Sequence, residues 1–183
     1  MDIIRSEGAD ALSARSICKK LGCSVTPLFW VFKNMEELLG EVRKAAEKLF
    51  ADYVADSINY VPAFKEFGLR LIRFAREEQQ LFLYLFFDEA ADEGFVYLEA
   101  MEGLRQNEPL FGLSPEQSEF IFRHIWPFAC GLAVLSSKTP DLYSEETISR
   151  MLSNQFRALL MLAKSGEEAV DIKPRIMIQD KQD

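Results

Sequence analysis

Few residues in this chain have the types and spacing that covalent chemistry requires. His124 is the only histidine, so a histidine cluster for a metal is impossible, and no GxSxG-type segment supplies a nucleophile for it to activate. A packing or pocket role therefore suits His124 better. Four carboxylates have the i,i+4 spacing that offers oxygens to a divalent cation, although a solvated helix face explains them better. They are Asp88, Glu89, Asp92 and Glu93. We therefore expect no catalytic residue, no metal site and no cofactor.

The composition indicates a soluble cytoplasmic protein with one large or two small domains. Of the 183 residues, 49% are hydrophobic and 12% are aromatic, which is ample for a buried core. The three cysteines form no CxxC pair, and their odd number argues against a disulfide framework. No secretory signal is recognisable, and no stretch approaches the roughly 20 unbroken apolar residues that a membrane-spanning helix needs. We expect no membrane partner.

The formal charge of −8 is unevenly distributed along the chain. Residues 1–48 hold eight Lys and Arg against seven Asp and Glu, whereas residues 49–183 hold 13 against 22. An acidic total disfavours a nucleic-acid binder. However, fields are screened beyond about 10 Å, so a local surface near the N-terminus can still face phosphates.

Apolar residues recur at helical spacing almost throughout, and no run of strict alternation predicts a strand, so we expect an all-α protein. The N-terminal part predicts four helices, separated by glycines or capping residues. They are a short opening helix through Ser6, a helix from Ser13 to about Leu21, a short helix from Ser24 to about Val31, and a long helix opened by Asn34 and Glu37.

The remaining chain predicts several more helices and a polar tail. One begins after Pro62, and the most apolar segment follows at residues 81–87. The capping box Ser114-Pro115-Glu116-Gln117 opens a long helix with a kink expected at Pro127. A last helix runs from Ser144 to Ala163, and the tail after it is expected to be loosely held.

The segment from Ser13 to Leu39 carries the strongest functional signal. A helix of about eight residues, a three-residue turn and a second short helix have the spacing of a helix-turn-helix, whose second helix enters the major groove of DNA. The string SARSICKKLGCSVTPLFWVFKNMEELL resembles the N-terminal domain of the tetracycline-repressor (TetR) family of transcription regulators. The likeness covers about 30 residues, including the glycine turn, the aromatic cluster and the opening of the long helix.

This resemblance implies that residues 24–31 form the recognition helix. Its first residues would face the bases, where Thr26 can donate or accept a hydrogen bond or touch a thymine methyl group. Basic side chains and the Ser24 backbone would meet phosphates and so position the protein. The implied DNA-binding residues are Val25, Thr26 and Pro27 at the bases, Arg15, Lys19, Ser24 and Lys33 at phosphates, and the aromatic Phe29 and Trp30.

The chain also departs from the family pattern. The family usually has a lysine, a tyrosine and a second lysine where this sequence has Val25, Phe29 and Met35. Those side chains commonly donate to phosphates, and the opening helix starts only seven residues before Gly8. We therefore expect low DNA affinity or a compensating set of contacts.

Aromatic residues in the middle of the chain predict an apolar pocket for a small hydrophobic effector, although a core position explains any single one of them better. The expected pocket residues are Phe64, Phe67, Phe74, Tyr84, Phe87 and His124, with Phe82, Phe86, Phe95 and Tyr97 as further aromatic candidates. The polar anchors favoured by the sequence are His124, Arg123, Tyr84 and Arg73.

The last two long helices resemble the family's dimerisation pair. Both have apolar residues on several sides, and such a helix needs more than one neighbour; burial within a monomer is the alternative. A two-fold dimer would also suit DNA with two half-sites. The expected interface residues are Ile121, Ile125, Phe128, Leu132, Leu152, Phe156 and Leu159.

These features predict a helix-turn-helix DNA-binding domain at residues 1–45, a helical ligand-binding and dimerisation domain at 46–165, and a loosely ordered tail at 166–183. The predicted function is a homodimeric transcription repressor that binds double-stranded operator DNA and is released by an apolar effector. The alternative is a helical ligand-binding or protein-interaction module that has kept the fold but lost useful DNA binding. No enzymatic activity is expected.

Overall fold

A computed structural model describes residues 1–59, 62–88 and 108–165. In these ranges the chain is all-α, as predicted, with nine α-helices and no strand. The helices are α1 (Asp2–Glu7), α2 (Ala14–Leu21), α3 (Val25–Val31), α4 (Met35–Val54), α5 (Ala63–Glu77), α6 (Gln79–Phe87), α8 (Glu108–Phe111), α9 (Pro115–Lys138) and α10 (Glu145–Ser165). Two 3-10 segments, Ala9–Ala11 and Ala55–Asn59, connect them. The predictions for Glu89, Asp92, Glu93, Phe95, Tyr97 and the tail 166–183 lie outside the described residues.

Helix starts follow local capping signals. Ser13 accepts a hydrogen bond from the Ser16 amide at the start of α2, and Ser114 with Gln117 forms the predicted capping box at α9. Asn34 accepts from the Glu37 amide at 2.8 Å, which opens α4. The Glu37 carboxylate accepts from the Lys33 amide rather than from that of Asn34. Ser24 stands at the N-cap of α3, but its hydroxyl makes no capping bond, unlike the prediction.

The turn between α2 and α3 depends on Gly22. Its φ of 68° lies in the left-handed region, which costs a glycine little and other residues more. The Cys23 amide then reaches the Cys18 carbonyl at 3.0 Å, and the Gly22 amide reaches that of Lys19 at 3.4 Å. This pair of bonds ends α2 and redirects the chain into α3.

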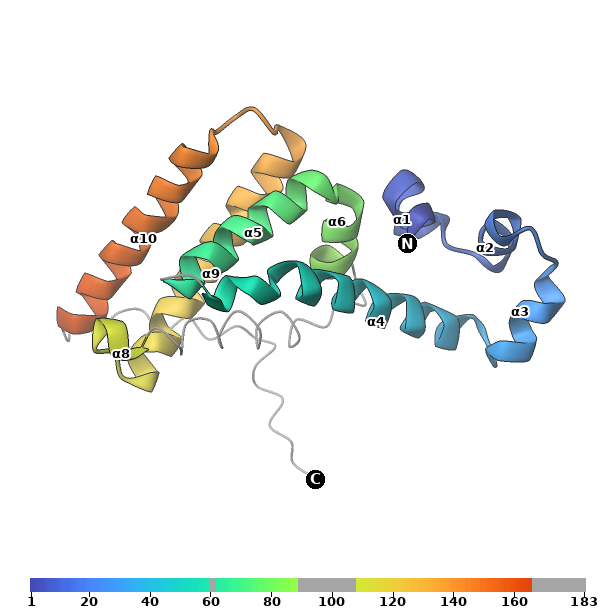
Figure 1. Cartoon of the computed structure of the whole chain (residues 1–183), viewed down its shortest axis with the longest axis horizontal. Coiled ribbons are helices and arrows are strands. Elements are labelled where there is room, and N and C mark those ends of the chain that lie inside the picture. Colours follow the sequence, from blue (N-terminus) through green and yellow to red (C-terminus); the bar gives the residue numbers. More distant parts are fainter. Residues whose placement is uncertain (60–61, 89–107, 166–183) are drawn as a thin grey trace, which may run out of the picture.

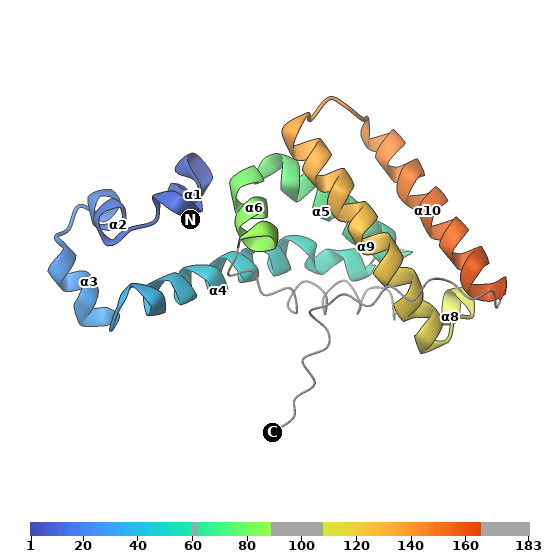
Figure 2. The same ribbon diagram turned by 180° about the vertical axis from the view of Figure 1, so that it is seen from behind.

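The main core lies in a bundle of α4, α5, α6, α9 and α10 (Figure 1). Phe50 of α4 is fully buried, and its ring makes edge contacts with Phe67, Phe74 and Phe86 at centroid distances of 6.3, 5.1 and 5.2 Å. Seen from behind, α9 and α10 run beside each other, with α5 behind α9 (Figure 2). α4 continues out of this bundle toward α2 and α3, so it joins the two parts of the molecule.

The opening helix α1 packs against the bundle rather than with α2 and α3. Ile4 is fully buried in the main core, and α1 contacts α6. Arg5 also forms a two-pronged ion pair with Glu78, with N–O distances of 2.8 and 2.7 Å. The expected N-terminal domain at residues 1–45 therefore differs from the observed packing, because α1 has its apolar partner on α6.

α9 is, by length and composition, the one described helix that could also cross a membrane. Buried core helices pass the same test. Here α9 packs against both α5 and α10, with Ile121, Phe122, Ile125 and Leu132 in the shared core. The buried side of α9 is thus apolar because it faces these two helices.

Candidate functional site

Two features of the described residues have the character of a binding site: the exposed α2–α3 unit and a cavity within the bundle. The α2–α3 unit has a small core of its own, in which Cys18, Leu28 and Leu38 pack together. This core is separate from the main core and lies at the outer end of α4 (Figure 1). The unit is therefore connected to the body by α4 on one side and by the short segment after α1 on the other.

The α2–α3 unit is locally basic. Residues 13–33 contain four of the 21 Lys and Arg residues and none of the 29 Asp and Glu residues. Arg15, Lys19 and Lys33 are exposed and form no ion pair with other described residues, whereas Lys20 lies 3.7 Å from Asp2. The acidic total of the chain is thus carried outside this unit. A count over the unit itself, instead of over residues 1–48, would have revealed this local charge.

α3 buries one side chain and exposes most of the others. Leu28 is 8% exposed, whereas Trp30 and Val31 are 80% and 74% exposed. The predicted base-facing residues Val25 and Thr26 are exposed, Pro27 is half-buried, and Phe29 is 40% exposed. The predicted DNA-binding residues therefore share one exposed unit, but its accessible surface is more apolar than is usual for a surface helix.

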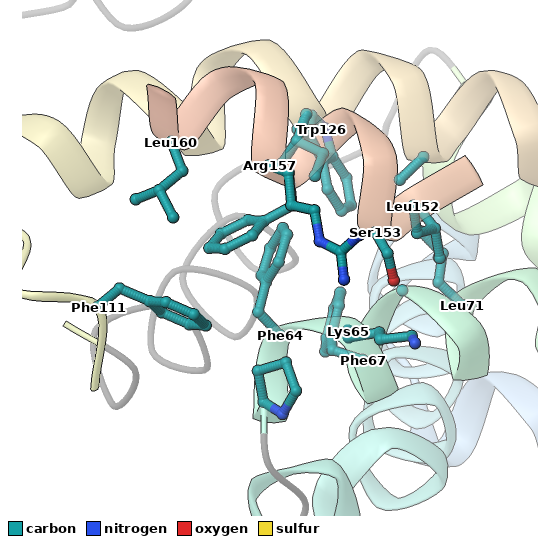
Figure 3. Close-up of a pocket in the computed structure, with 15 residues that line it drawn as sticks. Phe64, Lys65, Phe67, Leu71, Phe111, Trp126, Leu152, Ser153, Arg157 and Leu160 are labelled. Carbon is teal, nitrogen blue, oxygen red and sulfur yellow. The ribbon is translucent and has the colours of Figure 1, made fainter. Parts of the chain in front are cut away.

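A cavity of about 300 Å³ lies between α5, α9 and α10, with Phe111 of α8 at one side (Figure 3). This volume is at the lower end of the range for small-molecule pockets, which runs from about 300 to 1,000 Å³. Of the residues expected at an effector pocket, Phe64 and Phe67 line this cavity. The remaining lining residues are Pro62, Lys65, Gly68, Leu71, Phe111, Ile125, Trp126, Ala129, Leu152, Ser153, Phe156, Arg157 and Leu160.

The other four predicted pocket residues do not line this cavity. Phe74 is fully buried between the rings of Phe50 and Tyr53. Tyr84 is buried beneath the Arg43 guanidinium, whose central carbon is 4.9 Å from the ring centroid. Phe87 is 55% exposed at the end of α6. His124 Nδ1 donates to the Phe120 carbonyl of its own helix at 2.8 Å. Helical spacing alone did not reveal which face of each helix meets the cavity.

The polar residues at the cavity are also different from the expected anchors. Arg123 pairs with Glu119, and Arg73 pairs with Glu145 and, at 3.6 Å, with Glu66. Lys65 and Arg157 line the cavity instead, and neither was predicted as an anchor. Arginines on helix surfaces commonly pair with an acidic residue four positions away, and Arg157 has none. This was the one sequence signal that Arg157 has a different role.

The predicted dimer residues lie mostly inside the single chain. Ile121, Ile125, Leu132, Leu152 and Leu159 are between 0% and 6% exposed, because α9 and α10 turn these faces toward α5 and toward each other. Phe156 is half-buried and lines the cavity. Phe128 is half-buried on a face of α9 that also carries the exposed Leu135.

A chain of packed aromatic rings joins the cavity to the long helix. Phe67 of α5 lines the cavity, and its ring lies 6.3 Å from that of Phe50 on α4. Arg43 of α4 also donates to the carbonyls of Tyr84 and Leu85 at the end of α6, both at 2.7 Å. A change in the cavity therefore has a physical route to α4, which carries α2 and α3.

Within the described ranges, no group of three or more His, Cys, Asp and Glu residues could hold a metal ion. No protein-family model matches the chain, and no curated protein or solved structure matches it significantly.

Proposed function

We propose that the chain is a DNA-binding transcription repressor whose affinity for its operator is lowered by a small ligand in the bundle. The observation that carries this proposal is the α2–α3 unit, with its own core, a net charge of +4 and a position at the outer end of α4. Two short helices joined by a tight turn fit the major groove of DNA, as the resemblance to the TetR family implies.

In this proposal the contacts have two roles. Arg15, Lys19 and Lys33 meet phosphates and supply affinity without sequence preference. Val25 and Thr26, at the exposed start of α3, meet base edges and thymine methyl groups. Since only these three cations per protomer meet phosphates, the expected affinity is modest, and its dependence on salt is that of about three phosphate contacts per protomer.

The cavity supplies the regulation. A ligand shifts the equilibrium between two arrangements of α4 only if it binds one of them more tightly. Contact between Phe67 and Phe50 lets occupation of the cavity favour one position of α4, and thereby one placement of α2 and α3.

A homodimer completes the proposal, because a two-fold protein reads two half-sites. The outward faces of α9 and α10 offer Leu135, at 48% exposed, and Met161, at 74% exposed. Phe128 lies on the same side of α9 as Leu135. These residues, rather than the buried ones expected from the sequence, are the ones we propose for the interface.

The test is binding of the full chain to duplex DNA from its own upstream region, measured by fluorescence anisotropy over a series of salt concentrations. The logarithm of the binding constant should fall linearly with the logarithm of salt, by about 0.9 per phosphate contact. Lys19→Gln should reduce that slope by about one per protomer. Lys48→Gln is the matched control, since Lys48 is 75% exposed on α4, outside the α2–α3 unit.

The apolar surface of the α2–α3 unit favours a second candidate function. Trp30, Val31 and Leu21 are each at least 67% exposed, and exposed apolar patches mark protein-interaction surfaces. A helical ligand-binding or protein-interaction module without DNA binding would use this surface. The same experiment separates the two functions: absence of DNA binding at low salt favours the interaction module, whereas binding with an unchanged slope in Lys19→Gln shows that Lys19 meets no phosphate.

A further inference from the structure

The cavity between α5, α9 and α10 combines an apolar lining with two cations. Lys65 comes from α5 and Arg157 from α10, so the two helices each place one positive charge at the same cavity (Figure 3). Neither forms an ion pair with any residue in the described ranges. The third polar residue, Ser153, already donates its hydroxyl to the Ser149 carbonyl at 2.9 Å.

The two cations lie where the cavity opens. Lys65 is half-buried and Arg157 is exposed, whereas Phe67, Leu71 and Ile125 are at most 3% exposed at the inner wall. A ligand with a charged head at the mouth of the cavity would keep that head in contact with water, while its apolar tail would move out of water into the interior. The arrangement is thus polar at one end and apolar at the other.

We propose that the ligand of this cavity is an amphipathic organic acid, with its anionic head between Lys65 and Arg157 and its apolar tail against Phe64, Phe67 and Trp126. This proposal rests on the ligand-regulated function above and names the class of effector. A neutral molecule would leave both cations without a partner, and a cationic one would be repelled by them. An organic acid gives both cations an anionic partner, and the arginine guanidinium in particular can bind a planar carboxylate through two parallel hydrogen bonds.

The size of the cavity indicates the length of the tail. Each water-sized group occupies about 30 Å³, so 300 Å³ holds roughly ten of them. A saturated acid of about ten carbons is therefore a suitable probe, and decanoate is the one we choose.

The chain contains its own reporter for this experiment. Of its two tryptophans, Trp126 lines the cavity and Trp30 is exposed on α3. In a Trp30→Phe background, emission comes from Trp126 alone. Addition of decanoate should change the Trp126 emission until the change reaches a plateau. Decan-1-ol should bind at least about tenfold more weakly than decanoate, and decylamine should bind more weakly still.

Charge removal tests the role of the two cations. Lys65→Gln and Arg157→Gln should each weaken decanoate binding by about fivefold, and the double variant by at least about tenfold, because each partly exposed ion pair contributes up to about 1 kcal/mol. Decan-1-ol affinity should change by less than about twofold, which also shows that the cavity is intact. Arg150→Gln, an exposed residue of the same helix, is the matched control.

Equal affinity for the acid and the alcohol, no binding of decanoate, or full affinity in the double variant would each overturn the proposal. These measurements involve no DNA. Charge-dependent decanoate binding by a chain that binds no duplex would support the ligand class and contradict the repressor function. Salt-dependent DNA binding without decanoate binding would support the DNA-binding function and contradict the ligand class.

Discussion

The contact between α4 and α6 yields the most direct test of how the body holds the long helix. Arg43 is 11% exposed, and its guanidinium donates to the carbonyls of Tyr84 and Leu85, both at 2.7 Å. These carbonyls belong to the last four residues of α6, which have no partner within their own helix. The positive charge also lies at the negative end of the helix dipole and above the Tyr84 ring.

Arg43→Met should lower the free energy of unfolding by about 3 kcal/mol. Each hydrogen bond from a charged donor contributes about 1.5 to 3 kcal/mol, and we take the lower value for both because the carbonyls can partly rehydrate. Methionine keeps the packing of the side-chain stem. Arg43→Lys should cost about half as much, since an ammonium cannot reach both carbonyls with the same fork.

The control is Lys44→Met, one position along the same helix. Lys44 is 72% exposed and pairs only with Glu41, so its loss should cost less than about 0.5 kcal/mol. Urea denaturation measures all three variants, with an unchanged slope showing that the midpoint reports stability. If Arg43→Met shifted the midpoint no more than Lys44→Met, the inferred role of Arg43 in joining α4 to α6 would be refuted.

Two further predictions concern α5 and the end of α4. Gly68→Ala should raise the free energy of unfolding by roughly 0.5 kcal/mol, as measured by urea denaturation. Alanine favours a helix by up to about 1 kcal/mol over glycine, and Leu152, 3.3 Å from the added Cβ, can move toward the cavity. A loss of stability would mean that Leu152 cannot move. Burial, with the hydrogen bond to Glu77, raises the pKa of Tyr53 to about 12 from an ordinary value near 10. The folded state therefore holds this proton more tightly, and its contribution to stability, complete below pH 10, should be lost between pH 10 and about 12. Tyr53→Phe should flatten that part of the stability profile, whereas identical profiles above pH 10 would contradict the assignment.

The link from Phe67 through Phe50 to α4 bears on the proposed regulation. Phe50 is fully buried and touches rings of both α5 and α6, so α4 cannot move without repacking them. Close-packed interiors respond to such changes by switching between discrete arrangements rather than by gradual deformation. This is the physical property that ligand control of the α2–α3 unit would require.

Helix positions in the N-terminal part and at α9 could be predicted from the sequence because their signals are local. Ser13, Asn34 and Ser114 accept hydrogen bonds from amides three residues away, and Gly22 supplies the left-handed turn by itself. Such interactions involve only a few neighbouring residues, so they depend little on the rest of the chain. The cationic character of the α2–α3 unit is equally readable from the sequence.

Only the tertiary structure decided which side chains face which neighbour. Helical spacing places Ile125, Phe156 and Phe64 each on an apolar face, but it does not distinguish a core, a cavity and an interface, because all three are apolar. The packing of α5 against α9 and α10 put Lys65 and Arg157 at one cavity although they are far apart in the sequence. Likewise, α1 joined the bundle because α6 offered Ile4 a buried site and Arg5 a carboxylate. The sequence therefore determined the helices and the charge of the exposed unit, while long-range packing determined the cavity and its polar residues.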